Sequence, residues 1–273
     1  MGPRRAERLL RAVLLGRVTS AREVARQRPG LATGEVALLL ILAAGAWAAT
    51  IVIARGMTGM TGTMGLGLAA FVPVWALMMT AMMLPSVVPT ARLYAKTVQS
   101  NRMARVGGLV VGYLAVWTAA GLPAYGLARL AGSLTGQHPG AAQVMAVAVF
   151  AAAGVYQLSR AKDRCLAHCR SPLALLLHYG SYRGRLRDLR VGVHHGAYCL
   201  GCCWGLMAIL IAVGVMNIAA MVGLAALVLI EKTWTWGVGF SRLAGAAALA
   251  LAVATIWLPW LAPGLHPAMQ MMN

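Results

Sequence analysis

Long apolar segments, separated by short basic or glycine-rich ones, recur along this chain of 273 residues. Each is about twenty residues long, the length that a helix needs to cross a bilayer core of roughly 30 Å. Polar and apolar residues do not alternate with a period of two, so only helices fit the pattern. We therefore predict an all-α fold, a polytopic transmembrane helix bundle of about seven spans. The predicted spans are 36–54, 66–88, 107–128, 141–158, 197–215, 218–230 and 244–261.

The sequence leaves open how the fifth and sixth spans are connected and where the second span ends. The sixth is short and follows the fifth directly, with Met216 and Asn217 as the expected turn. The two could be separate helices, one long and strongly tilted helix, or a re-entrant pair. In the second span, Pro85 is expected to kink or stop the helix, because proline removes a backbone donor and clashes with the preceding turn.

The basic residues predict the orientation of the bundle. Of the 24 lysines and arginines, all but Arg55 and Arg129 fall on one side of the predicted spans. Positive charge concentrates in cytoplasmic loops, so we expect a multi-pass protein of the bacterial inner membrane, with its N-terminus inside and its C-terminus outside. The same distribution accounts for the net charge of +18 without a nucleic-acid partner. A reducing cytoplasm favours free thiols over disulfides.

The chain divides into three parts. Residues 1–35 form a basic arm, which is either an amphipathic helix on an anionic membrane face or disordered. Residues 36–262 form the transmembrane domain, with a Cys/His-bearing cytoplasmic loop at 160–196, and residues 263–273 form an extracytoplasmic tail rich in histidine and methionine. No Walker, dinucleotide-binding or Ser-His-Asp signature is present, so the sequence favours a protein that is not an enzyme.

Two clusters of cysteine and histidine carry the most specific chemistry. All five cysteines lie between residues 165 and 203, and three histidines lie among them. Within each cluster the spacing is i, i+3 and i+4, which places the side chains on one face of a helix. A lone cysteine in a membrane helix is usually a packing residue, but this density favours a metal site. The candidate ligands are Cys165, His168, Cys169, His194, His195, Cys199, Cys202 and Cys203.

The ligand types narrow the choice of metal. Thiolates and imidazoles suit Cu(I) and zinc, whereas calcium, magnesium and manganese need carboxylates, of which the chain has only six. Cu(I) is the favoured metal. Zinc is the alternative, because a closed set of four cysteines would hold it. Basic residues such as Arg164 and Arg170 flank the first cluster and are expected to favour thiolates and to balance the negative charge of the site.

Methionine is abundant, with 16 residues. Met79, Met82 and Met83 lie on one face of the second predicted span. Thioethers bind Cu(I), but methionine also fills irregular gaps in ordinary cores. A soft cation could pass from outer methionines along this span to the inner thiols. The outer residues are Met57, Met60, Met64, His266, Met269, Met271 and Met272.

The motifs together resemble a known family. The chain is similar, over about residues 60–245, to bacterial predicted metal-binding integral membrane proteins, the domain-of-unknown-function 2182 family. The resemblance implies a membrane architecture and a metal site at the cysteines and histidines. We expect Glu231 and Lys232 to form an ion pair at the inner boundary. The motifs are WALMMTAMMLP at 75–85, CLAHCR at 165–170, HGAYCLGCCW at 195–204, VGVMN at 213–217 and EK at 231–232.

Three functions remain open. The first is a soft-metal protein, for copper above all, that acts in transport, delivery or metalloenzyme assembly. The second is a non-catalytic subunit or scaffold of a membrane complex with a structural metal. The third is a membrane thiol-disulfide oxidoreductase that uses Cys199 and Cys202. The expected partners are the lipid bilayer and a metallochaperone or other subunits of a membrane complex.

Overall fold

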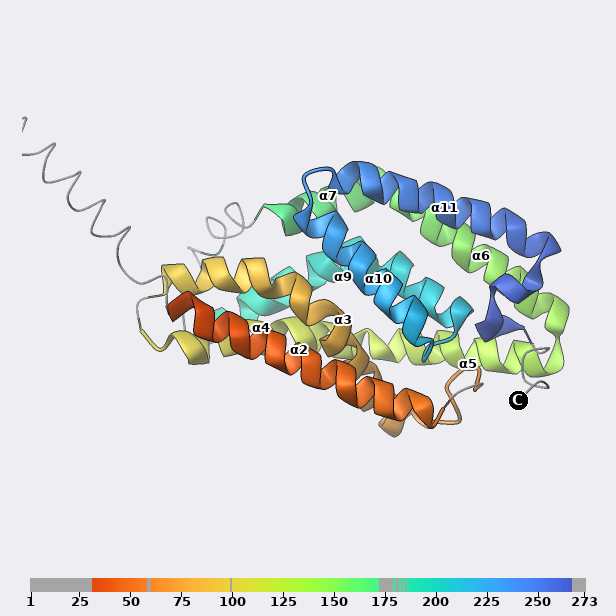
Figure 1. Ribbon diagram of the computed structural model, residues 1–273, viewed down its shortest axis with the longest axis horizontal. Helices are drawn as coiled ribbons and strands as arrows, with labels where there is room; N and C mark the ends of the chain where they lie inside the picture. Colours follow the sequence, from red (N-terminus) through yellow and green to blue (C-terminus); the bar gives the residue numbers. More distant parts are fainter. Residues whose placement is uncertain are drawn as a thin grey trace, which may run out of the picture.

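The computed structural model describes residues 31–57, 60–98, 100–171, 179, 182, 184 and 186–266. Throughout these residues the regular secondary structure is helical, and the helices run roughly along one common direction (Figure 1). The prediction of an all-α bundle is confirmed. The basic arm over 1–30 and the outer residues Met269, Met271 and Met272 lie outside the described part of the chain.

Six segments among the described residues are long and apolar enough to cross a membrane, as a multi-pass protein requires. Helix α10, Ile218–Thr233, has only 16 residues, about 24 Å at 1.5 Å per residue. The described part of the bundle therefore has six full-length candidates, and α10, which corresponds to the sixth predicted span, is not among them. α9 and α10 are separate helices, joined at Gly214, whose φ of 108° favours glycine. The long segments are α2 (Leu31–Arg55), α3 (Leu68–Thr97), α4 with α5 (Arg102–Ala119 and Gly121–Gln137), α6 (Pro139–Gln157), α9 (Arg187–Val213) and α11 (Gly237–Trp257).

Helix α3 is longer than the span predicted from the sequence, in which Pro85 is expected to kink or stop the helix. It continues past Pro85 and Pro89 to Thr97 instead of ending near residue 88, and its ribbon bends part-way along (Figure 1). Membrane helices tolerate proline because neighbouring groups and local adjustments of the helix compensate for the missing backbone donor. The Ser86 hydroxyl donates to the carbonyl of Met83 at 2.8 Å.

A tryptophan separates α4 from α5. Trp75 Nε1 donates to the carbonyl of Trp117 at 3.0 Å, the acceptor that Gly121 N–H would use in an unbroken helix. The indole also fills the space beside Gly121, where an added Cβ would lie 2.9 Å from Trp75 Cδ1. An inserted side chain of this kind explains why the helix is interrupted at Ala120.

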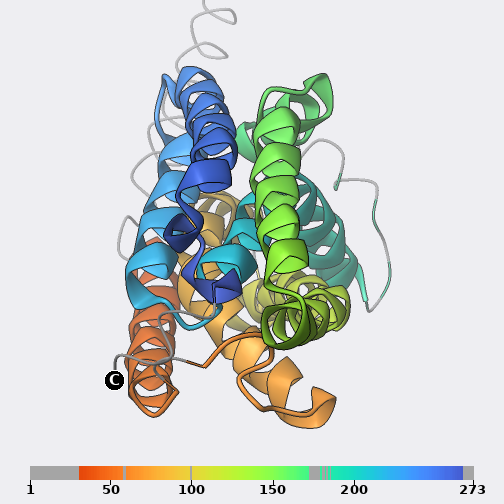
Figure 2. The same ribbon diagram turned by 90° about the vertical axis from the view of Figure 1, so that its right-hand side faces the viewer.

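Glycines bring two pairs of helices into close contact. A Cβ on Gly192 of α9 would lie 2.0 Å from the Leu109 carbonyl oxygen of α4, and one on Gly112 would lie 2.2 Å from the carbonyl oxygen of Leu189. α6 and α11 run side by side (Figure 2), and the Gly154 position approaches the Gly245 carbonyl in the same way. Small residues at such crossings let membrane helices pack backbone to backbone.

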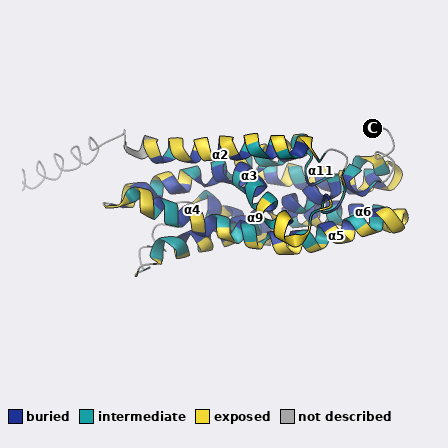
Figure 3. Cartoon of the chain, turned by 90° about the horizontal axis from the view of Figure 1, so that it is seen from below, coloured by how far each residue is buried: buried dark blue, intermediate teal, exposed yellow. Residues whose placement is uncertain are grey.

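Apolar side chains cover much of the outside of the bundle, and several charged side chains lie inside it. Exposed residues line α2 and the outer faces of the other helices (Figure 3). Large exposed side chains include Ile41, Val52 and Val144, whereas Lys162 and Glu231 are fully buried. This distribution, with apolar side chains outside and charged ones inside, suits a lipid environment. There a buried charge needs a partner inside the bundle.

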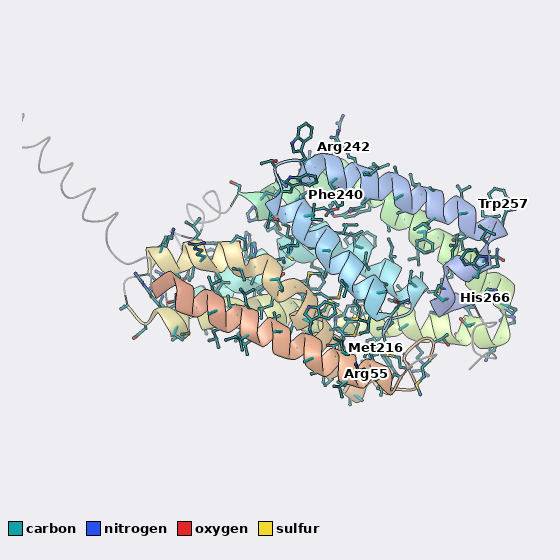
Figure 4. All side chains as sticks on the ribbon, in the orientation of Figure 1. Arg55, Met216, Phe240, Arg242, Trp257 and His266 are labelled. Atoms are coloured by element: carbon teal, nitrogen blue, oxygen red, sulfur yellow. The ribbon has the colours of Figure 1, made fainter. Side chains whose placement is uncertain are left out.

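Exposed tryptophans flank helix α11, and the chain after it folds back. Trp234 and Trp236 precede the helix, and Trp257 marks its other end (Figure 4); tryptophan is typical of both membrane–water interfaces. Two short 3-10 helices, Pro259–Leu261 and Pro263–Leu265, follow. Gly264 then lies against the end of α9, where an added Cβ would be 2.6 Å from the Ile211 carbonyl oxygen.

Candidate metal centre

Three cysteines of α9 form a compact group in the interior. Cys199, Cys202 and Cys203 are all buried, and their sulfur atoms lie within 4.8 Å of one another. α9 begins at Arg187 rather than near residue 197, so these thiols lie about 18 to 24 Å along the helix rather than at its start. The helix starts earlier because its first turns also pack against α4. The group therefore lies inside the bundle and not at the mouth of a span.

A fourth thiol reaches this group from a different helix. Cys169 lies on α7, Arg160–Arg170, and its sulfur is 3.8 Å from Cys202 Sγ. Cys202 Sγ is 3.1 Å from Cys203 Sγ. The two cysteine clusters of the sequence thus meet in space through Cys169. Cys165, one turn earlier on α7, lies instead against Gly201, where an added Cβ would be 3.0 Å from Cys165 Sγ.

A lysine and a tyrosine hydroxyl contact Cys199, and Ser86 contacts that lysine. Lys232 Nζ donates to Cys199 Sγ at 2.8 Å and to Ser86 Oγ at 3.1 Å. The Tyr113 hydroxyl lies 2.9 Å from the same sulfur. An ammonium group stabilises a neighbouring thiolate. Lys232 is therefore a cation in direct contact with the thiol group, whereas Arg160 and Arg164, near the first cluster, are exposed.

Glu231 does not pair with Lys232 as predicted. Its carboxylate binds Lys162 Nζ at 2.7 Å and accepts a hydrogen bond from Gln157 Nε2 at 2.5 Å. Residues 231 and 232 are consecutive on α10 and therefore face different ways, which explains why one turns to α7 and the other to the thiols. Lys162 Nζ also donates to the Cys202 carbonyl at 2.5 Å. The pair thus fixes α7 against the cysteine-bearing turn of α9.

His195 lies one turn before Cys199 on the same face of α9. It is 3% exposed, and its ring stacks on that of Tyr113 with centroids 5.8 Å apart. Its Nδ1 is buried without a hydrogen-bond partner among the described residues. A buried imidazole nitrogen without a partner is costly in an ordinary core, so His195 remains a candidate ligand.

The other two candidate histidines lie in an aromatic group. His168 stacks on Tyr198 with centroids 3.8 Å apart, and its ring lies 5.6 Å from that of His194. Tyr179 Oη lies 2.8 Å from His194 Nδ1. Burial raises the pKa of the Tyr179 phenol, which thus keeps the proton that it can donate. Neither histidine belongs to the ligand group found among the described residues.

The candidate methionines of α3 lie in the core. Met79, Met82 and Met83 are all buried, and the Met83 carbonyl accepts a hydrogen bond from Ser86, whose hydroxyl also contacts Lys232. The turn containing Met83 therefore adjoins the thiol group. Of the outer residues, Met64 is buried, with a left-handed backbone (φ 58°), and Met60 is exposed.

Comparison with known proteins identifies the family of the chain. Residues 72–255 match the model of the PpoB2 family, which is described as a copper chaperone. The chain belongs to this family. The match supports a copper-related family, but it does not support the name of the domain-of-unknown-function 2182 family that the sequence motifs resemble. No curated protein and no solved structure is significantly similar to the chain. The family and the cysteine group together indicate copper binding.

The sequence interpretation missed several residues around the thiols. Tyr113 and Ser86 lie far from the cysteines in the chain. Tyr113 reaches Cys199 because α4 packs beside α9, and Ser86 of α3 reaches Lys232 because α3 packs against α10. Lys162, one of the basic residues that flank the first cluster in the sequence, is buried and pairs with Glu231. One signal was available for Lys232: a lysine at the end of an apolar segment has to find a partner or reach the interface.

Proposed function

We propose that this protein holds Cu(I) inside the membrane bundle and delivers it for metalloenzyme assembly. The ligands are Cys199, Cys202 and Cys203, with Cys169 as an exchangeable fourth thiol and His195 as an additional donor. The observation that carries the proposal is the convergence of buried thiols on one point, next to the ammonium group of Lys232. The family match supports copper as the cargo.

The donor set suits a soft monovalent cation. Metal–thiolate bonds of about 2.3 Å require sulfur atoms nearly 4 Å apart. The Cys169–Cys202 separation of 3.8 Å already meets this, whereas the sulfurs of Cys202 and Cys203, 3.1 Å apart, have to separate on binding. Three thiolates with Cu(I) carry a net charge of −2, and the ammonium of Lys232 offsets part of it. No carboxylate belongs to the ligand group among the described residues, as expected for a site that rejects hard cations.

Elemental analysis and X-ray absorption of the detergent-purified full chain test the proposal. We expect about one copper per chain in the wild type, with sulfur neighbours, and none in a variant with Ser at positions 199, 202 and 203. Cys165→Ser, which removes a thiol outside the group, is the matched control and should retain copper. Zinc in place of copper would favour a structural site in a scaffold protein. No metal in any variant would refute the ligand assignment.

The oxidoreductase alternative fits the geometry less well. Thiol-disulfide exchange requires attack by an incoming thiolate on an accessible sulfur, and both Cys199 and Cys202 are at most 1% exposed. Copper could reach these thiols through a chain of neighbouring ligands, whereas a protein dithiol could not. A Cys199–Cys202 disulfide that forms and breaks during turnover, detected by alkylation and mass spectrometry, would reverse this ranking.

A further inference from the structure

The five cysteines form a gradient of burial that ends on α7. Cys199, Cys202 and Cys203 are at most 1% exposed, Cys169 is 9% exposed, and Cys165 is partly exposed. The last two belong to α7, which lies across the thiol-bearing part of α9. Each step of the gradient joins neighbouring groups: Cys202 contacts Cys169, and Cys165 lies one helical turn from Cys169.

We propose that α7 is the transfer arm of the copper site. Cys169 takes Cu(I) from the buried thiols, and Cys165 passes it to a soluble Cu(I) ligand that approaches from outside the bundle. This role deepens the proposed function and rests on it. It assigns Cys165 to transfer rather than to the resting coordination shell.

The local sequence of α7 places one thiol in the core and one at its edge. Lys162, Leu166 and Cys169 are buried and share a face by their spacing. Cys165 lies beside that face, with its sulfur over Gly201. Because Gly201 lacks a side chain, this sulfur can sit against α9, one residue away from Cys202. A larger residue at 201 would separate Cys165 from the thiol group.

Transfer proceeds by ligand exchange without a redox step. A copper–sulfur bond to Cys169 forms as the bond to Cys202 breaks. A bond to Cys165 then forms as the bonds to Cys199 and Cys203 break, and the bond to Cys169 breaks as the soluble ligand binds. Each incoming thiol loses a proton, and each outgoing thiolate takes one up. Copper stays Cu(I) throughout. The exchange ends when the soluble ligand replaces Cys165.

A buried ion pair fixes the position of α7 relative to the thiol group of α9. Lys162 of α7 binds both the Glu231 carboxylate and the Cys202 carbonyl. Arg170, next to Cys169, donates to the carbonyls of Glu231 and Thr235. These bonds fix α7 at its two ends, so the Cys169 sulfur stays within reach of Cys202. The exposed side of the helix carries Arg160 and Arg164, which attract an anionic ligand.

The rate at which copper leaves the protein tests the arm. The full chain in detergent, loaded anaerobically with Cu(I), is mixed with bathocuproine disulfonate, an anionic chelator whose Cu(I) complex absorbs visible light. We expect Cys165→Ser to slow transfer by about tenfold, equivalent to about 1.4 kcal/mol in the barrier, with the bound copper and its Kd unchanged. Ala167→Ser, an exposed position on the same helix, is the matched control and should behave as the wild type.

The outcomes separate the arm from the proposed function. If the wild type binds no copper, the proposed function itself fails. If the wild type and Cys165→Ser bind copper equally and release it at the same rate, only the arm is refuted. Cys165→Ala repeats the measurement without a hydroxyl. Should both variants misfold, a charged maleimide on wild-type protein provides the same test: selective labelling of Cys165 must slow transfer, and fast transfer after labelling refutes the arm.

Discussion

At the scale of single residues, Lys232 distinguishes this site from a simple cluster of thiols. Its ammonium group contacts Cys199 Sγ and Ser86 Oγ in the interior of an apolar bundle. A site of several thiolates would otherwise concentrate negative charge where water cannot screen it. One fixed cation makes such a site more tolerable, because it reduces the net charge of three thiolates and Cu(I) from −2 to −1.

Replacing this lysine tests its role. We expect Lys232→Met to weaken copper binding by about thirtyfold or more, because losing one partner of a buried charge pair costs roughly 2 kcal/mol or more. Competition with a Cu(I) chelator measures the change. Lys96→Met, at an exposed position near the end of α3, is the control. Equal affinities in the two variants would show that Lys232 does not stabilise the copper site.

At the scale of helices, α7 depends on a buried ion pair for its position. Lys162→Met or Glu231→Gln should each destabilise the protein by about 3–5 kcal/mol, because each leaves an uncompensated polar or charged group. The double variant Lys162→Met with Glu231→Leu should recover part of the loss. Thermal unfolding in detergent measures both effects.

The matched control is a second ion pair of the same helix. Asp163 and Arg242 lie 3.7 Å apart and are much more exposed, so Asp163→Asn should cost at most about 1 kcal/mol. If the single variants of the buried pair unfold at the same temperature as Asp163→Asn, the pair does not hold α7 in place.

The crossing of α4 and α9 allows a second prediction at this scale. A methyl group at Gly192 would overlap the Leu109 carbonyl, so Gly192→Ala should separate the helices and strongly lower the yield of folded protein. Gly126→Ala is the control, because no atom lies within 4 Å of the added carbon; it should be neutral or slightly stabilising. Size-exclusion chromatography in detergent reports both results.

At the scale of the whole molecule, the distribution of charge predicts how the bundle lies in the membrane. Both ends of the apolar helices carry interfacial tryptophans, whereas lysine and arginine concentrate at one end. By the positive-inside rule, we expect the end bearing α7 to face the cytoplasm. The transfer arm would then meet a reducing compartment, where thiols remain available for copper.

Reporter fusions test this orientation. Green fluorescent protein fused before residue 1 or after residue 171 should fluoresce, because both positions are predicted to be cytoplasmic. Alkaline phosphatase fused after residue 273 should be active, because the C-terminus is predicted to lie outside. Active phosphatase after residue 171 would invert the topology. Copper exchange through α7 would then occur on the outer side.

Much of the fold and part of the site could be predicted from the sequence. The apolar segments predicted the helices, because a backbone in lipid has to satisfy its own hydrogen bonds. The i, i+3, i+4 spacing placed His195, Cys199, Cys202 and Cys203 on one buried face of α9, as the structure has them. These properties depend on near neighbours in the chain, so local pattern is sufficient to determine them.

Only the tertiary structure decided which distant residues complete the site. Cys169 and Cys202 are 33 positions apart, and their contact depends on how α7 packs across α9. Glu231 pairs with Lys162 of α7 and Lys232 contacts Cys199 of α9, instead of the two pairing with each other. This follows from the position of α10 between α7 and α9. Local spacing determines the face on which a side chain lies, but the packing of helices determines what that face meets.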